Sequence, residues 1–246
     1  MNWEKLKTFL IVLFSIINIF LITMKITTSS ENASIPKSTI SDTVSVLSKN
    51  DIKISENIIP DKVKNMDDIT LKPVTMVDGF LPNDAYIDSM SFEFDSGTVI
   101  STQQELKKLL SSCKFKKYRV LKGFSHESAK IVQLVKGYPI FDAEIDIECK
   151  KDKTKISGAW FKAQSYPKKS SDSVSPVTIT GILIDFINNP ARGEGEQTIK
   201  SIDYGYTVSK PENDNVLYTA VPCWKIELDN GEKFFYNARN GEYIES

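Results

Sequence analysis

An uncharged apolar run close to the amino terminus constrains this chain more than any other feature. Residues 9–24 read FLIVLFSIINIFLITM, and the short head before them carries Lys5 and Lys7. An apolar α-helix needs about 20 residues to cross the hydrocarbon core of a bilayer, and about 17 is the lower end of the usual range. Residues 9–26 just reach that length, with Lys25 able to extend its charged end towards the interface. We therefore predict a single transmembrane helix over residues 9–26.

A cleaved signal peptide is the alternative interpretation of this segment. The apolar core of such a peptide is usually about 7–15 residues long, and small residues at alternate positions precede the cleavage site. Here the core is longer, Ala33 has Glu31 two positions before it, and the run from Thr27 to Ser29 is a weak cleavage site. The pattern favours a retained anchor.

The basic residues near the start of the chain predict how the anchor is oriented. Positive residues beside a membrane helix favour the cytoplasmic side. Lys5, Lys7 and the amino terminus outweigh the lone Lys25 at the other end. We expect residues 1–8 in the cytoplasm, the helix in the cell membrane and the carboxy-terminal part of the chain outside the cell.

Composition limits the function of the part beyond the anchor, which has about 220 of the 246 residues and is long enough for one large domain or two small ones. The charges of the whole chain nearly cancel, because 31 basic and 32 acidic residues give a net charge of -1. No overall field therefore exists to hold nucleic acid, and nucleic acid is excluded as a partner.

Three widely spaced cysteines, Cys113, Cys149 and Cys223, form no CxxC motif, and the chain has one histidine. Cys149 and Cys223 lie in apolar strand patterns, which favours small buried hydrophobic residues. A single disulfide plus one free thiol is the alternative, and the sequence does not say which two would pair. Disulfides are not expected to hold the fold together.

Local patterns predict an α+β fold made of antiparallel sheets, each packed with a helix. After a polar spacer over 27–38, apolar residues at Ile40, Val44 and Leu47 predict a short helix that ends near Asn50, followed by a strand over 51–54. The fold of the rest of the amino-terminal segment, 39–91, is left open.

Two similar modules are expected after this segment, over residues 92–166 and 174–246, each beginning with a helix that precedes several strands. The Ser-, Pro- and Lys-rich stretch at 165–176 is the expected hinge between them. The helices are predicted at 102–112 and 176–189. The strands are predicted at about 115–122, 129–137, 139–149, 155–164, 199–209, 216–228 and 232–238.

One strand carries the most enzyme-like pattern in the chain. Its acidic residues alternate with apolar ones, so all the carboxylates emerge on one face of the strand. They are Asp142, Glu144, Asp146 and Glu148. Such a row can bind a cation or supply an acid and a base, but either role needs further residues to form a pocket. The favoured interpretation is a solvated acidic face opposite the basic run from Lys114 to Lys122.

Other candidate chemistry is weaker still. His126 lies between Ser125 and Glu127, whose side chains point elsewhere, and no base is identifiable for a cysteine nucleophile. The glycine-rich stretch at 193–196 contains acids that repel phosphate. We therefore predict no catalytic residues, no cofactor-binding residues, no metal ligands and no enzyme activity.

Several stretches resemble the YycI family of regulatory proteins. The start MNWEKLKTFLIVLFSIINIFL and the middle stretches GYPIFDAEIDI and KISGAWFKA are similar to that family. The ending is more specific, with SIDYGYTVS followed by VPCWKIELDNGEKFFYNARNGEYIE. The residues that carry the motif are Pro222, Trp224, Tyr236, Asn237, Ala238, Gly241 and Glu242. A looser form of the same ending is found in PepSY-like domains.

The resemblance implies a regulator of the WalK/WalR (YycG/YycF) two-component system of Gram-positive bacteria. It implies that the outer part pairs with a YycH-like partner and that the anchor contacts the transmembrane helices of a WalK-like sensor histidine kinase. Contacts between helices in lipid depend on packing and on occasional polar groups, so Ser15 and Asn18 are the candidate contact residues. The alternative for Asn18 is that the bilayer tolerates a single amide.

Two other classes of function compete with the kinase regulator. One is an anchored PepSY-like module that binds or inhibits an extracellular peptidase, and the other is a surface hydrolase that uses the acidic strand. The regulator needs the sequence of the anchor helix, whereas the other two need only tethering. The sign of the effect on the kinase, any sensed ligand and the oligomeric state are not predicted.

Overall fold

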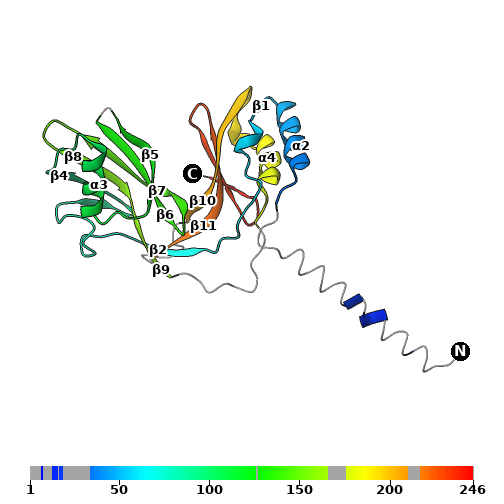
Figure 1. The fold of residues 1–246 in the computed structure, drawn as a ribbon, viewed down its shortest axis with the longest axis horizontal. Helices are drawn as coiled ribbons and strands as arrows, with labels where there is room; N and C mark the ends of the chain where they lie inside the picture. Colours follow the sequence, from blue (N-terminus) through cyan, green and yellow to red (C-terminus); the bar gives the residue numbers. More distant parts are fainter. Residues whose placement is uncertain are drawn as a thin grey trace.

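The computed structural model describes Lys7 and residues 13–15, 17–18, 34–125, 127–165, 176–209 and 217–245 (Figure 1). The fold is rich in strands and has few helices, which confirms the predicted α+β class. The helices are α2 (Lys37–Ser48), α3 (Gln103–Ser112) and α4 (Ile179–Ile187), with short 3-10 turns η1 (Glu56–Ile58) and η2 (Pro190–Arg192). The strands are β1 (Ile52–Lys53), β2 (Ile69–Pro73), β3 (Tyr86–Asp88), β4 (Ser91–Ser96), β5 (Tyr118–Ser125), β6 (Ser128–Val135), β7 (Tyr138–Cys149), β8 (Thr154–Ala159), β9 (Phe161–Ser165), β10 (Gln197–Ser209), β11 (Tyr218–Leu228), β12 (Lys233–Asn237) and β13 (Tyr243–Ile244).

Most of the predicted anchor lies outside the described residues. Within residues 9–26, only 13–15, 17 and 18 are described, and all of them are helical and exposed. No helix among the described residues is both long enough and apolar enough to cross a membrane. The predicted transmembrane helix therefore remains a prediction from the sequence.

The first half of the fold is an antiparallel sheet in the strand order β3-β4-β8-β7-β6-β5, with α3 packed beside it (Figure 1). α3 begins at a capping box, in which the Thr102 hydroxyl accepts from the backbone N–H of Glu105 and the Glu105 carboxylate accepts from that of Thr102. Its buried face is Leu106, Leu109 and Leu110, which pack into a core with Phe115, Ile145 and other residues of the sheet. Such capping and burial stabilise a helix of only three turns.

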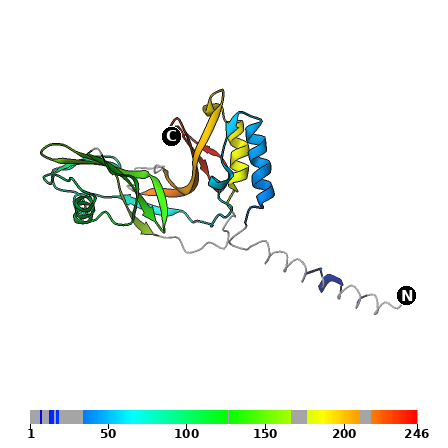
Figure 2. The same ribbon diagram turned by 45° about the horizontal axis from the view of Figure 1, so that its top comes forward.

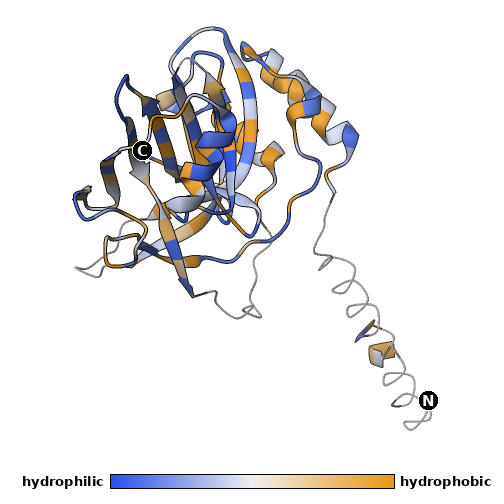
Figure 3. Cartoon of the chain, turned by 60° about the vertical axis from the view of Figure 1, so that its left-hand side comes forward, coloured by the Kyte–Doolittle hydropathy of each residue, from blue (hydrophilic) through white to orange (hydrophobic). Residues whose placement is uncertain are grey.

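The second half is the sheet β1-β10-β11-β12-β13, and helices α2 and α4 lie together over one of its faces (Figure 2). Leu47 of α2 and Phe186 of α4 are fully buried against Trp224 and Ile226 of β11. α4 ends just before Pro190, as its sequence predicts, because proline cannot continue the helix. In Figure 3, hydrophobic and hydrophilic residues alternate along the strands.

Among the described residues, the two halves are linked into one 13-stranded sheet. β2 pairs with the first part of β11 and with β9, while β7 and β10 run parallel where Ile140 lies opposite Tyr206. A third, smaller core fills this region and includes Leu71, Ile140 and Tyr206. The expectation of purely antiparallel sheets is therefore wrong in two places, since β1–β10 and β7–β10 are parallel pairs.

The predicted elements agree closely with the structure. The three predicted helices are found as α2, α3 and α4, and each predicted strand from 115 onwards coincides with one or two observed strands. The amino-terminal segment 39–91 is shared among the parts of the fold: α2 and β1 join the second half, β2 the middle and β3 the first half. His126 and residues 166–175 of the predicted hinge lie outside the described residues.

Candidate functional site

A narrow junction joins the two halves of the fold where β7 approaches β10. Gly205 on β10 makes this approach possible, because a Cβ at that position would lie 2.5 Å from the carbonyl oxygen of Pro139. Beyond the single parallel pair of Ile140 and Tyr206, the Asp142 carboxylate of β7, and not its backbone, accepts hydrogen bonds from β10. It accepts hydrogen bonds from the backbone N–H of Val208 at 2.7 Å and from the Thr207 hydroxyl at 2.9 Å. Asp142 therefore satisfies a strand donor that β7 no longer reaches.

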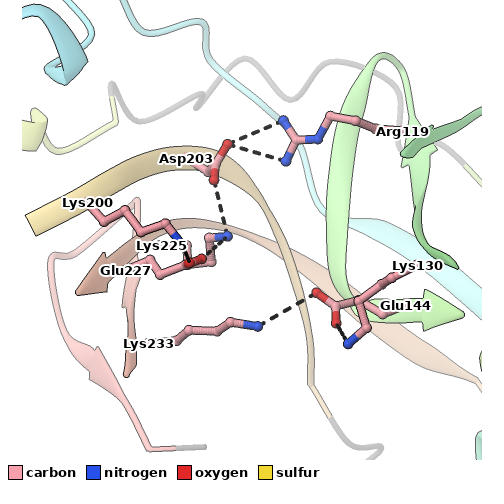
Figure 4. A network of polar contacts seen from close by, with 8 residues as sticks. All are labelled: Arg119, Lys130, Glu144, Lys200, Asp203, Lys225, Glu227 and Lys233. Atoms are coloured by element: carbon pink, nitrogen blue, oxygen red, sulfur yellow. Dashed lines mark hydrogen bonds and ion pairs between the residues drawn. The ribbon is translucent and has the colours of Figure 1, made fainter. Parts of the chain in front are cut away.

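A chain of ion pairs crosses the junction (Figure 4). Asp203 of β10 accepts from both terminal nitrogens of Arg119 on β5 at 3.3 Å, and its other oxygen lies 3.1 Å from Nζ of Lys225. Lys225 also lies 3.3 Å from Glu227, which pairs with Lys200 at 3.0 Å. This chain connects an edge strand of the first half to the sheet of the second half.

Lys225 is the most buried charge in this network, with 9% of its side chain exposed. Its Nζ also lies 5.2 Å from the centre of the Phe141 ring, and Phe141 packs against Phe235 at 5.8 Å between ring centres. A buried cation is tolerated only when partners replace its hydration. Two carboxylates and an aromatic face provide that replacement here.

A second set of ion pairs lies beside the first (Figure 4). Glu144 of β7 pairs with Lys130 of β6 at 2.9 Å and lies 3.9 Å from Nζ of Lys233 on β12. Lys130 also pairs with Asp146 at 3.3 Å. Partial burial works against the charge of Lys130, but the hydrogen bond and charge of Glu144, together with Asp146, raise its pKa above the usual value. Lys130 therefore stays charged.

Glu227 shows the same balance for a carboxylate. Burial works to raise its pKa, but the hydrogen bond from Lys200 and the charge of Lys225 outweigh that effect and hold the pKa below the usual value. Glu227 is therefore ionised at neutral pH, as its ion pairs with Lys200 and Lys225 require.

The acidic row predicted from the sequence lies on β7, but its predicted opposition to the basic run from Lys114 to Lys122 is wrong. β6 lies between β5 and β7, so the residue opposite Asp146 is Lys130, while Lys155 of β8 is opposite Glu148. Asp142 bonds to β10 instead. Glu144 and Asp146 share Lys130 as a partner, and neither pairs with the basic run. The described residues contain no group of His, Cys, Asp and Glu that could hold a metal ion.

Motif residues near the carboxy terminus hold both ends of α4 against the second sheet. The Trp224 indole donates to the Val177 carbonyl at 3.0 Å, and its ring lies 4.6 Å from that of Tyr204. The Tyr236 hydroxyl accepts from the Asn189 side-chain amide at 2.7 Å. These bonds tie both ends of α4 to β11 and β12.

The last turn completes this arrangement. Ala238 is fully buried, and its backbone N–H donates to the Pro222 carbonyl at 3.0 Å. Gly241 has a φ of +80°, which favours glycine, and its N–H donates to the Asn237 carbonyl at 2.9 Å. The backbone N–H of Asn237 donates to the Glu242 carbonyl at 2.8 Å. The motif residues therefore make structural contacts that hold α4 and the carboxy-terminal turn against the sheet.

The three cysteines are free in the structure. Cys149 and Cys223 are buried and Cys113 is partly buried. Burial raises the pKa of the Cys113 and Cys223 thiols, so both stay protonated and poorly nucleophilic. The structure thus contains none of the candidate disulfides.

Sequence reasoning did not identify Asp203, Lys225, Glu227 and Lys233 as members of the junction. A signal was present on β11, where Lys225 interrupts a run of residues that are otherwise mostly apolar. A lysine in such a run needs carboxylate partners from neighbouring strands. The candidate helix-contact residues Ser15 and Asn18 lie far along the chain from this network, and both are helical and exposed.

Comparison with models of protein families gives an extensive match. A family model described as YycI protein matches residues 26–239. No curated protein matches the chain. Among solved structures, the chain is similar to an uncharacterized protein from Eubacterium rectale ATCC 33656, with a TM-score of 0.40 and 12% sequence identity. The similarity covers 61% of this chain and 58% of that protein, so the chain spans less than two thirds of that relative's length.

Proposed function

The chain belongs to the YycI family, and we propose that it is a membrane-anchored regulator of a WalK-type sensor histidine kinase. Membership of this regulatory family supports a role in the YycG/WalK system. The observation that carries the proposal is the extent of the family match, because residues 26–239 include almost the whole chain beyond the predicted anchor.

The amino-terminal residues support the anchor part of this proposal. Leu13, Phe14 and Ile17 are 41%, 60% and 42% exposed, so the described part of the chain leaves these apolar side chains uncovered. Apolar side chains on a helix within an uncharged run are stable when they face lipid or other membrane helices. We propose that residues 9–26 span the cell membrane, with the amino terminus in the cytoplasm and the folded part outside the cell.

Regulation of this kind requires no catalysis. A kinase that signals across a membrane has transmembrane helices with at least two arrangements, and a further helix that prefers one of them shifts their populations by its difference in affinity. We propose that the anchor makes such contacts through Ser15 and Asn18, and that the outer domain pairs with a YycH-like partner. The ion pairs that engage Asp203, Glu144 and Glu227 are consistent with a stabilising role for these acids.

Co-purification of the kinase with two versions of the full chain tests this proposal. One version carries the native anchor, and in the other polyleucine replaces residues 9–24. We expect recovery of the kinase with the native anchor only, because polyleucine keeps the tether but removes the polar and shape-specific contacts. Equal recovery with both versions would indicate that the kinase contacts the outer domain and not the anchor. No recovery with either version would contradict the proposal.

Single substitutions sharpen the same experiment. Asn18→Leu and Ser15→Leu remove the candidate polar contacts, whereas Ile17→Leu is a matched control that keeps an apolar side chain of equal size. We expect kinase output in cells to change with Asn18→Leu or Ser15→Leu and to stay unchanged with Ile17→Leu. An alanine scan of residues 9–26 that left kinase output unchanged at every position would defeat the role of the anchor sequence.

A further inference from the structure

β5 is an open edge of the first half of the fold. Among the residues that the structure describes, β5 pairs only with β6, and no strand lies along its other side. Its five central residues, 119–123, are all exposed, and Val120 and Leu121 are 40% and 41% exposed. Towards the end of β5 the Phe124 N–H donates to the Gln103 side chain at 3.0 Å. Before that point the edge presents backbone N–H and C=O groups without a strand partner, together with uncovered apolar side chains, which are the two features that an added strand uses.

The charge of this edge is entirely positive. Residues 114–125 read KFKKYRVLKGFS and contain no acidic residue, although the whole chain has a net charge of -1. Arg119 pairs with Asp203, and Lys122 donates to the Ser128 hydroxyl at 2.8 Å. In the described part of the chain, no carboxylate lies within ion-pair distance of Lys116 or Lys117, and both are exposed.

The positive charge of the β5 edge determines which side-chain charges an added strand can carry. A second copy of β5 would place lysines and arginines opposite one another, which is destabilising, so pairing of the chain with itself through this edge is disfavoured. A strand with acidic side chains would instead meet cations along its length. Its backbone would satisfy the open N–H and C=O groups, and its apolar side chains would cover Val120 or Leu121.

We propose that the β5 edge binds an extended acidic segment of a partner protein by strand addition. The inference rests on the open edge and its charge and does not depend on the anchor, so the two proposals fail separately. A strand of protein is favoured over a non-peptide polyanion, because a polyanion would use the cations but neither the backbone groups nor the apolar side chains.

Binding of an acidic peptide to the full chain in detergent tests the proposal. The probe is a fluorescent peptide of eight residues in which glutamate alternates with valine. Two further peptides carry N-methyl groups on alternate residues, one on each backbone edge. Since only one edge of an added strand bonds to β5, we expect one methylated peptide to lose binding and the other to keep it. Equal binding of both methylated peptides, or no binding of the parent peptide, would overturn the proposal.

Charge reversal identifies the edge that the peptide occupies. Lys117→Glu combined with Lys122→Glu should weaken binding at least about tenfold, because two attractions become repulsions. The matched control, Lys37→Glu with Lys49→Glu, changes the net charge equally on exposed residues of and beside α2 and should leave binding unchanged. Equal weakening in both variants, or full competition by inorganic polyphosphate against the parent peptide, would indicate non-specific attraction and overturn strand addition. Slower amide exchange over residues 118–125 in the complex is expected on the same grounds.

Discussion

At the scale of single residues, Lys225 is the charge on which the junction depends most. Its side chain is 9% exposed and contacts Asp203 and Glu227, but each of these acids also has another cation, Arg119 or Lys200. We therefore expect Lys225→Met to reduce the free energy of unfolding by about 1–3 kcal/mol, below the cost of leaving a buried charge wholly unpaired. Urea unfolding of the chain in detergent measures this loss.

Lys233 provides a matched control for that measurement. It lies on the neighbouring strand β12, but it is 41% exposed and its Nζ is 3.9 Å from the Glu144 carboxylate. Exposed pairs of this kind contribute roughly 0–1 kcal/mol, so Lys233→Met should have a small effect. If both lysine variants lowered stability equally, burial of Lys225 would not be what makes it important. A double-mutant cycle with Asp203→Asn then isolates the energy of the Lys225–Asp203 pair.

At the scale of elements, the contact between β7 and β10 depends on Gly205. A methyl group there would lie 2.5 Å from the Pro139 carbonyl oxygen and 2.8 Å from the Phe141 ring, so one of the strands must shift. We expect Gly205→Ala to destabilise the fold by about 2–4 kcal/mol, in the range of overpacking within a core. The amide of Val208, which donates to Asp142, should also exchange faster with solvent.

Gly123 on β5 is the control for this substitution, since nothing lies within 4 Å of the position that its Cβ would take. Gly123→Ala should change stability by no more than about 0.5 kcal/mol. Comparable losses at both glycines would show that the close approach at Gly205 is not the cause.

Elements with a strong local pattern were predictable from the sequence. The alternation of acidic and apolar residues on β7 predicts which of them are buried. The capping box and apolar stripe of α3 predict where that helix begins and which face it buries, and the proline after α4 predicts where that helix ends. Strand order was not predictable in the same way. Periodicity shows which face of a strand is buried but not which strand lies beside it, so the acids of β7 were assigned to the basic run on β5 instead of to Lys130 on β6.

Contacts between distant parts of the chain were the least predictable. α2 packs against α4, about 140 residues later, and β2 joins β11 to β9. The short apolar stretches in residues 39–91 do not indicate which later elements they pack against or pair with. The junction residues Asp203, Lys225 and Glu227 were missed for the same reason, because their pairing exists only after β5, β10 and β11 are assembled.

At the scale of the whole molecule, ion pairs set how stability depends on pH. Asp78, Asp95 and Glu105 have pKa values below the usual ones, owing first to hydrogen bonds from Lys162, from Lys153 and from the backbone of Ser101, respectively. Glu227 has a lowered pKa as well. In each case the folded state binds a proton less readily than the unfolded state. Their stabilisation is therefore complete above the unfolded pKa, about 4, and is lost as the pH falls through the lower folded values.

Asp68 has the opposite effect. Burial raises its pKa, against the opposing charge of Arg239, so its contribution is present at low pH and is lost as the pH rises through the raised value. Among the described residues with a clear shift, four carboxyl groups have a lowered pKa and one has a raised pKa. We therefore expect the urea midpoint to fall below about pH 4. A midpoint that stayed constant as the pH fell from about 5 through the lowered folded pKa values would contradict this expectation.

The share of the buried junction in this acid response can be separated from that of the surface. Glu227→Gln removes a group that titrates within the junction, so the variant should show a smaller loss of stability between about pH 5 and pH 3 than the unaltered chain. Salt discriminates further, because added salt screens exposed pairs such as Asp95 with Lys153 more than the partly buried pair of Glu227 and Lys225. If the Glu227→Gln variant lost as much stability as the unaltered chain at both low and high salt, Glu227 would have no part in the acid response, and the ion pairs of Glu227 would not be what makes the junction sensitive to pH.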